Sequence, residues 1–538
     1  MNEVDFENKY VELDGLQFEN RFTSELVGDP IKLNNRRQVT GAYFSNVNPT
    51  ITSAPKMLAA SNEVLDLIGL EKNIVNSQVF ADVFSGNALT RGMEPHAMCY
   101  GGHQFGNWAG QLGDGRAINL GEIVTEDELY YMLQLKGAGP TPYSRSGDGR
   151  AVLRSSIREF LCSEGMFHLG VTTTRALSLC STGDQVMRDM LYDGNPAEEP
   201  GAVVCRVAPS FIRFGNFEIF ASRGEVDELK GLLDFVVKHY FPEMGEPSPA
   251  SYVHFFEEIV KSTALLIAHW QRVGFVHGVM NTDNMSIHGL TIDYGPYGWI
   301  DDFDPDWTPN TTDRHQRRYR FRNQPAIGHW NLAQLANSLY PAIQDIQPLQ
   351  EALDTYEDTF NKNWSSMMAE KLGLLNFSSA NSQLVLSNLF EILQSGEIDM
   401  TIFFRSLAKL DISENQATQQ NLKVLQEAYY VPDAMPKEHW SLLVNWTADY
   451  INVLKDQGVD DADRIQRMNS VNPKFVLRNY LAQLAIDDAE NGDLSMVKDL
   501  LIMLRNPYDE QPEFEKWAGK RPDWAKNRPG CSMLSCSS

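Results

Sequence analysis

Basic residues are scarce in this sequence. Across 538 residues, 46 Lys and Arg stand against 71 Asp and Glu, which gives a net charge of −25. A chain this acidic repels nucleic acids and anionic membranes, so we expect no general binding to either. The sequence also lacks an apolar run of about 18 residues, the length that a membrane-spanning helix needs. The first ten residues contain no Arg and resemble neither a secretory signal nor a transit peptide.

Cysteine is also rare, with six residues in the whole chain and no C-x-x-C pair. An H-E-x-x-H motif is missing as well, so the sequence supports neither a disulfide scaffold nor a zinc site. Four cysteines stand alone among apolar neighbours: Cys99, Cys162, Cys180 and Cys205. This usage predicts a reduced protein of the cytoplasm. Cys531 and Cys536 lie in the last eight residues, where we expect no core.

Apolar residues make up 43% of the chain, enough for large hydrophobic cores. The pattern is rich in glycine and short β-like runs from about residue 95 to 222, and mostly helical from about 250 onward. This change predicts an α+β protein with a β-rich lobe and a helical lobe, and a ligand site in the cleft between them. The predicted divisions are an N-terminal extension 1–94, a β-rich lobe 95–222, a helical lobe 223–345 and a helical C-terminal extension 346–538.

Several elements follow from hydrophobic periodicity. Runs at 117–120 and 129–135 predict strands, and 203–221 predicts β structure broken at Pro209. Helical spacing covers Pro55–Leu70, Ala151–Gly165 and Val253–Val273, with Gly165 and Gly170 as stop signals for the second helix. The stretch from Gly274 to about Pro325 predicts loops, and its acidic run 301–306 lacks the Gly and distal Glu of a calcium loop, so we expect a solvated turn. The polar tail 506–538 is expected to wrap the surface.

A glycine-rich stretch occupies residues 101–116, with six glycines in sixteen positions. Glycine lets a backbone approach a ligand closely, successive N–H groups can form an anion nest, and Arg116 would add a guanidinium for phosphate. Its end, Gly-Asp-Gly-Arg-Ala at 113–117, recurs at 147–151. An ordinary flexible loop, and two turns alike by chance, are the alternatives.

Lys136 ends the second predicted strand, and Glu159 lies in the middle of the helix that follows. Protein kinases hold nucleotide phosphates with a strand Lys that a helix Glu orients. A lone strand Lys is usually a solvated edge residue, but the order of Gly-rich loop, strand Lys and helix Glu is hard to obtain by chance.

A third motif follows the long helix, His277-Gly278-Val279-Met280-Asn281-Thr282-Asp283-Asn284, and Asp293-Tyr294-Gly295 comes soon after. Kinases read H-R-D-L-x-x-x-x-N and then D-F-G. Asn284 and Asp293 therefore occupy the metal-binding positions, and their oxygens suit Mg²⁺ or Mn²⁺. Val279 stands where a kinase has its catalytic Asp, and Asp283 is the carboxylate nearby. The alternative is a polar turn, in which Asp-Asn is common.

Two groups of arginines remain. Arg206 and Arg213 are seven residues apart and would point to opposite faces of a straight strand, but a bend at Pro209 would let them converge on a triphosphate. Surface arginines on a hairpin are the commoner case. Residues 314–322 contain five Arg, and with this net charge we favour a loop that meets substrate or phosphate over an RNA site.

Taken together, the motifs resemble the selenoprotein O family of protein adenylyltransferases with a pseudokinase fold. The similarity extends from Pro95-His96 through the motifs above to Asn472–Tyr480 and the terminal Cys536-Ser537-Ser538, and so covers most of the chain. It implies a protein-kinase-like, bilobal fold that binds ATP in a reversed orientation. AMP would then be transferred to Ser, Thr or Tyr hydroxyls of proteins.

The resemblance also implies roles for single residues. Asp283 would accept the proton, Asn284 and Asp293 would bind Mg²⁺ or Mn²⁺, and Glu159 would pair with Lys136. The positions implied to contact ATP are Gly113, Gly115, Arg116, Lys136, Asp148, Gly149, Arg206, Arg213 and Asp293. Some relatives carry selenocysteine where this chain has Cys536, and in some that residue is thought to pair with a cysteine after D-Y-G. No cysteine lies between Cys205 and Cys531, so Cys531 is the alternative partner.

The sequence leaves three other functions to be weighed. Val279 argues against an ordinary phosphotransferase that uses the γ-phosphate. Lys136, Asn284 and Asp293 argue against an inactive ATP-binding scaffold, which has no evident need for metal ligands. Transfer of UMP from UTP is a further variant that the sequence does not exclude.

Overall fold

The fold is built on a nine-stranded antiparallel sheet, seen in a computed structural model that describes residues 10–535. Seven strands follow the order β3-β6-β9-β10-β13-β12-β4, while β11 pairs with β13 and β2 with β9. Their bounds are β2 (Gln17–Phe18), β3 (Phe44–Asn46), β4 (Lys56–Ala60), β6 (His96–Met98), β9 (Ala117–Val124), β10 (Tyr130–Lys136), β11 (Ala151–Val152), β12 (Arg175–Arg188) and β13 (Ala197–Ala208). The strands predicted at 117–120 and 129–135 are confirmed.

The strand register brings polar and charged residues of β10 and β13 close together. Gln134 of β10 lies opposite Arg206 of β13, and Lys136 lies opposite Val204. Because side chains alternate along a strand, Gln134, Lys136 and Arg206 project from one face of the sheet. This face receives helix α4 (Leu153–His168), which carries Glu159.

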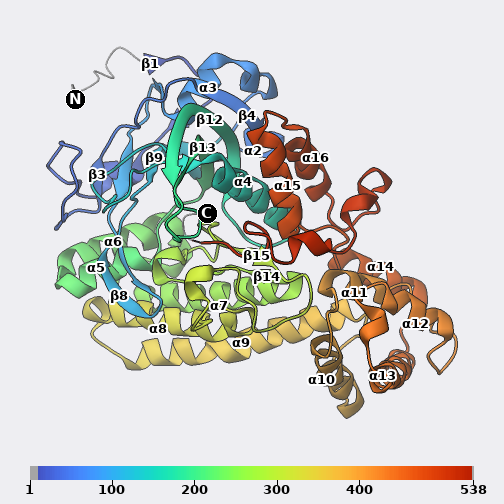
Figure 1. Ribbon diagram of the computed structural model, residues 1–538. Helices are drawn as coiled ribbons and strands as arrows, with labels where there is room; N and C mark the ends of the chain where they lie inside the picture. Colours follow the sequence, from blue (N-terminus) through green and yellow to red (C-terminus); the bar gives the residue numbers. More distant parts are fainter. Residues whose placement is uncertain (1–9, 536–538) are drawn as a thin grey trace.

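Helix α4 corrects one predicted boundary. We expected Gly165 to end this helix, but the helix continues to His168, and Gly170 with φ +72° follows its cap. A Cβ at position 165 would lie 3.3 Å from Leu504 of α16 (Ser495–Leu504). Glycine therefore allows close helix packing here, and Figure 1 shows α15 (Asn479–Glu490) and α16 beside α4.

Two other predicted segments change type halfway. Within Pro55–Leu70, residues 56–60 form β4 against β12, and Ser61 then caps α2 (Asn62–Leu67). Within 203–221, β13 ends at Ala208 and α5 (Phe214–Arg223) begins after Arg213, whose N–H donates to Asn216. In both segments a helix cap residue divides the apolar pattern into a strand and a helix. Read as one continuous pattern, the segment does not show this change of element.

Helices form most of the second half of the chain. The predicted helix 253–273 is confirmed as α7 (Pro249–Val273), and Figure 1 shows it along α8 (Gln324–Ile343) and α9 (Gln347–Lys371). The helices that follow are α10 (Ala380–Gln394), α11 (Met400–Leu407), α12 (Gln419–Gln426), α13 (Lys437–Asp456) and α14 (Asp461–Val471). Elements outside the sheet and these bundles are β1 (Tyr10–Val11), α1 (Arg21–Glu25), α3 (Gln78–Ser85), β5 (Leu89–Thr90), β7 (Gly101–Gln104), β8 (Asn107–Gln111), α6 (Val226–Tyr240), β14 (Phe275–Val276) and β15 (Gly298–Trp299).

The mixed α/β class is thus confirmed, with Gly274–Pro325 mostly loop as predicted. The largest hydrophobic core cluster joins sheet residues such as Leu133 to helix residues such as Phe255 and Leu335. The kinase-like bilobal arrangement and the divisions after residues 94, 222 and 345 stay predictions. Among residues 10–535, the helices are all too short or too polar to cross a bilayer.

Candidate active site

Lys136 and Glu159 form a buried ion pair between β10 and α4. The Lys136 ammonium also lies 3.9 Å from an Asp293 carboxylate oxygen. Burial lowers the pKa of Lys136 to about 8, although Glu159 acts in the opposite direction. The sequence prediction of a strand Lys oriented by a helix Glu agrees with this geometry.

Arg206 and Arg213 converge on the same carboxylate, as the predicted bend requires. Arg206 Nη1 lies 2.5 Å from Asp293 Oδ1 and 3.0 Å from Glu159 Oε1. Arg213 pairs with Asp293 Oδ2 and donates to the Asp283 carbonyl oxygen at 2.8 Å. Both guanidinium groups are almost fully buried. Three cationic side chains, Lys136, Arg206 and Arg213, therefore surround Asp293, and two of them also contact Glu159.

Asp293 has an unusual backbone for a residue with a side chain, with φ +61°. Such left-handed conformations cost of order 1 kcal/mol and are concentrated at functional sites. Burial alone would raise the pKa of Asp293, but Arg213, Arg206 and Lys136 outweigh burial and hold this pKa well below its usual range. Asp293 is therefore a permanent anion at any physiological pH.

Asp283 has the opposite electrostatic character. It lies in a 3₁₀ turn (Thr282–Asn284) and is 7% exposed. Its Oδ2 accepts a hydrogen bond from Gln104 Nε2 at 3.3 Å, while its buried Oδ1 has no partner among the described residues. Burial raises the pKa of Asp283 to about 7, with Gln104 and Arg213 opposing the rise. A carboxylate of this kind is suited to take a proton near neutral pH.

The loop around Asp283 is held by side chains that bond to backbone carbonyls. Asn284 Nδ2 donates to the Val279 carbonyl at 2.9 Å, which leaves its amide oxygen as the free end. The His277 ring lies 2.9 Å from the Ile292 carbonyl and so joins this loop to the one that carries Asp293. Val279 is buried and supplies no acid or base.

The glycine-rich stretch forms the hairpin β7–β8 and lies against the Asp283 loop. A Cβ at Gly102 would lie 2.8 Å from Asp283 Oδ1, so only glycine fits there without displacement. The His103 N–H donates to Thr282 Oγ1 at 2.7 Å. The glycine-rich stretch was predicted to form an anion nest; in the structure its hairpin lies over the candidate base, Asp283.

Sequence reasoning missed the residues that join this hairpin to the rest of the site. Glu218 of α5 accepts from Thr282 and lies 2.7 Å from the His103 ring. Its signal was a lone carboxylate within the apolar run Phe214–Phe220. Gln104 was part of the glycine-rich motif, but nothing in its spacing pointed to Asp283.

The two copies of Gly-Asp-Gly-Arg-Ala have different surroundings. Asp114 is buried 3.8 Å from Arg213, whereas Asp148 pairs with Arg188 at 2.8 Å instead of joining the cluster. The Gly137 N–H donates to the Arg116 carbonyl at 2.7 Å, and the Arg116 charge helps to lower the pKa of Lys136. Tyr143 packs on Gly113 and Gly115, and Gly149 packs on Gly139, so these glycines permit close backbone contacts.

The C-terminal tail corrects one prediction. Cys531 is 1% exposed and packs in a core cluster, although we expected it outside any core; Cys536 lies outside the described residues. Leu534 donates to the Pro309 carbonyl and accepts from the Thr311 N–H at 2.7 Å. Asn310, which lies between Pro309 and Thr311, donates its side-chain N–H to the Gly278 carbonyl at 3.0 Å. The tail therefore supports the loop that begins at Gly278 and carries Asp283.

The acidic run 301–306 is also not simply a solvated turn. Asp301 is buried and lies 3.3 Å from Arg478 and 3.5 Å from Arg521. These arginines come from the C-terminal region, nearly 180 residues or more along the chain. Distant charge partners of this kind leave no local sequence signal.

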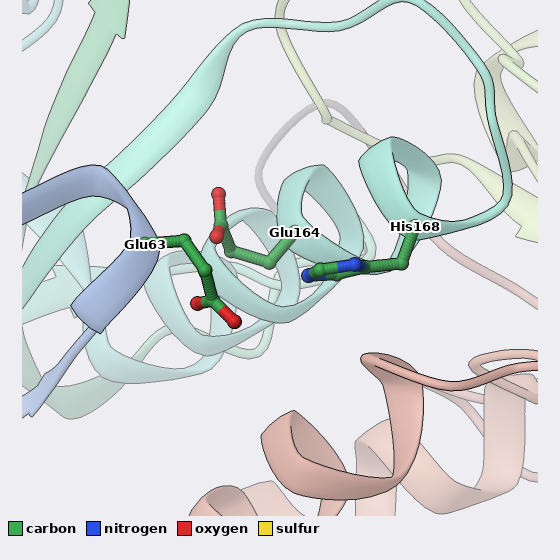
Figure 2. Close-up of side chains that lie close together, drawn as sticks. All are labelled: Glu63, Glu164 and His168. Atoms are coloured by element: carbon green, nitrogen blue, oxygen red, sulfur yellow. The ribbon is translucent and has the colours of Figure 1, made fainter. Parts of the chain in front are cut away.

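A second group of potential metal ligands lies away from these loops. One ligand atom each from Glu63, Glu164 and His168 lies within 4.8 Å of the others, as Figure 2 illustrates. Both oxygens of Glu164, however, accept from Arg175 at 2.8 Å, and one also accepts from Ser61. Glu63 pairs with Arg505 at 2.8 Å. These carboxylates are already neutralised, so the cluster has a structural explanation.

Comparisons with known proteins identify the family of this chain. The family described as Protein adenylyltransferase SelO matches residues 32–505. A protein of Rhodopirellula baltica named Protein nucleotidyltransferase YdiU is 57% identical over 97% of this chain and 99% of its own length. Proteins of the same name from Flavobacterium johnsoniae and Aromatoleum aromaticum are 54% and 57% identical over the same shares. The chain therefore belongs to the SelO family and is a nucleotidyltransferase.

Proposed function

We propose that this chain transfers AMP from ATP to Ser, Thr or Tyr hydroxyls of proteins and releases pyrophosphate. The observation that carries the proposal is Asp283, a buried carboxylate with a pKa raised to about 7 and one oxygen without a partner. It lies one residue from Asn284, and Arg213 contacts its backbone carbonyl. A base and a cationic site for phosphates are thus adjacent.

Arg206, Arg213 and Lys136 are the proposed holders of the triphosphate. All three now contact Asp293, and phosphate oxygens are the other anions that guanidinium groups bind well. Binding of ATP would exchange these contacts and release the Asp293 carboxylate. The further proposed contacts, at the edge of this cluster and in the 147–151 turn, are Gly113, Gly115, Arg116, Asp148 and Gly149.

The residues present fit a divalent cation. Asn284 offers its amide oxygen because its nitrogen is fixed on Val279, and Asp293 stays ionised. Amide and carboxylate oxygens suit Mg²⁺ or Mn²⁺. When bound, the ion supplies charge neutralisation of the phosphates. Its proposed ligands are Asn284 and Asp293.

In the proposed reaction, Asp283 takes the proton of the acceptor hydroxyl. The hydroxyl oxygen forms a bond to the α-phosphorus while the bond from that phosphorus to the bridging oxygen of the β-phosphate breaks. Arg206 and Arg213 hold the departing pyrophosphate and offset its charge. The reversed placement of ATP and the kinase-like bilobal fold belong to this proposal.

Two alternatives use the same residues. UMP transfer from UTP with Mn²⁺ would need only a different contact with the nucleobase, and the name nucleotidyltransferase that the relatives carry covers both nucleotides. A kinase reaction would use the γ-phosphorus, but the kinase base position is Val279.

The deciding experiment uses ATP labelled at either the α- or the γ-phosphate, with Mg²⁺ or Mn²⁺ and a protein acceptor. Label should enter protein from the α-position alone, and Arg213→Ala should reduce this transfer. Arg91→Ala, at an exposed position, is the matched control. Label from the γ-position would make the protein a kinase, and a parallel reaction with α-labelled UTP separates adenylyl from uridylyl transfer.

A further inference from the structure

Three arginines beside the site form no ion pair within residues 10–535. The nearby Asp313 carboxylate accepts the backbone N–H groups of Arg318 and Tyr319, and its charge interacts with Arg318 at longer range. Arg314 and Arg317 are exposed and Arg318 is half-buried, and within residues 10–535 no carboxylate forms an ion pair with any of them. Elsewhere in the same loop, Arg320 and Arg322 pair with Asp306 at 3.0 and 2.6 Å. In a chain with a net charge of −25, three guanidinium groups without an ion pair within five residues form a local positive surface.

This surface is continuous with the Asp283 loop. The Phe105 N–H, at the tip of the β7–β8 hairpin, donates to Tyr319 Oη at 2.9 Å, and Tyr319 Oη donates to Asn281 Oδ1 at 2.6 Å. A Cβ at Gly106 would lie 3.2 Å from the Arg318 guanidinium carbon. The arginine loop therefore lies against the hairpin that covers the candidate base.

Aromatic rings extend the surface along the hairpin. Arg318 lies over the Trp330 ring at 4.6 Å, and Trp330 contacts His103, which in turn contacts Trp108. Trp108 is 39% exposed, a large apolar side chain open to solvent on a glycine-rich hairpin. Aromatic residues and arginines are the side chains that most often dominate protein interfaces.

We infer that Arg314, Arg317, Arg318 and Trp108 form an acceptor surface, which binds a protein segment with acidic residues next to the hydroxyl that receives the nucleotide. The inference rests on the proposed function for the transfer step only. Arginines would attract the acidic side chains, and Trp108 would contact an apolar residue of the same segment. RNA also binds Arg and stacks on Trp, but the strongly acidic remainder of the protein repels a polyanion that extends beyond this surface.

The test uses three labelled peptides that contain one Ser and one Leu and differ only in flanking residues, which are Asp, Gln or Lys. Binding is measured by fluorescence anisotropy and transfer by incorporation of α-label, at low and high salt. The Asp peptide should bind about tenfold more tightly than the Gln peptide, and added salt should reduce the difference. The double variant R314E/R317E should lose this preference and favour the Lys peptide.

R322E is the matched control, because the charge of Arg322 is already neutralised by Asp306. The inference is wrong if wild type binds the three peptides equally, if R314E/R317E keeps the preference for Asp, or if a single-stranded RNA of similar length displaces the Asp peptide at lower concentration. Binding of the Asp peptide without any transfer of α-label would instead contradict the proposed function and leave the acceptor surface in place.

Discussion

The loops that carry Asp283 and Asp293 come from one short stretch of chain, yet they shift the pKa of their carboxylates in opposite directions. Asp283 is surrounded mainly by the glycine-rich hairpin and a single amide donor, and its pKa rises to about 7. Asp293 is surrounded by Arg206, Arg213 and Lys136, and its pKa falls well below the usual range. Burial alone would raise both, so the number of cationic neighbours decides the outcome.

This difference in pKa supports the two roles proposed for Asp283 and Asp293. A group that exchanges a proton near neutral pH needs a pKa near 7, whereas a metal ligand must be ionised at all times. Four experiments would break or sharpen the comparison.

The largest effect is expected for Asp283→Asn. Turnover should fall by about 10²–10⁴-fold, the usual range for a lost general base, while nucleotide affinity changes little. Incorporation of α-label and calorimetric binding measure the two quantities. Asp304→Asn, at an exposed position of the following loop, is the control. Near-normal turnover in Asp283→Asn would remove the assignment of the base.

Asp293→Ala should weaken metal-dependent nucleotide binding and also destabilise the protein. Arg206 and Arg213 would lose their shared carboxylate while buried, and breaking a buried pair of this kind costs roughly 3 kcal/mol. Denaturant unfolding with and without nucleotide would measure both effects. A variant with unchanged stability would show that Glu159 and Asp114 suffice to balance the two arginines.

The pH dependence of stability should separate the two carboxylates. The pKa of Asp283 is raised in the folded protein, so its contribution is lost as pH rises from about 4 to 7. Relative to wild type, Asp283→Asn should gain about 2 kcal/mol between pH 5 and 8. Asp293 behaves oppositely, because its lowered pKa stabilises the fold above pH 4 and the benefit is lost below. Urea titrations at several pH values would check both signs.

The smallest effect is expected for Gln104→Ala. Gln104 donates to the ionised Asp283, and its loss should raise the pKa of Asp283 by about half a unit, the equivalent of one modest hydrogen bond. Activity rises with pH as Asp283 loses its proton, so the midpoint of the pH–rate profile should move upward. Asn107→Ala in the same hairpin should leave the midpoint in place.

The sequence predicted those parts of the site whose signals are local. Lys136 and Glu159 each follow from the order of strand and helix, and the convergence of Arg206 and Arg213 from a proline between them. The sequence also predicted the strands at 117–120 and 129–135 and the helix at 253–273, because each segment has a single hydrophobic periodicity throughout. The predictions for segments 55–70 and 203–221 were wrong in part, because a cap residue inside each segment separates a strand from a helix.

The remaining features depend on contacts between distant segments. Glu218 reaches Thr282 across 64 residues, Leu534 accepts from Thr311 across 223, and Arg478 reaches Asp301 across 177. The burial of Cys531 follows from the same long-range packing. Nothing in the local sequence distinguishes these residues from polar or tail residues on a surface.

The contact between Leu534 and the loop at 309–311 bears on when the enzyme is assembled during synthesis. Thr311 is made 223 residues before Leu534, which corresponds to about 10–45 s of translation. Throughout that time the support for the Gly278 loop through Asn310 is incomplete. A nascent chain therefore contains Lys136, Arg206 and Asp293 long before Leu534 can support the Gly278 loop, so the complete assembly of these residues and this loop waits until Leu534 has emerged.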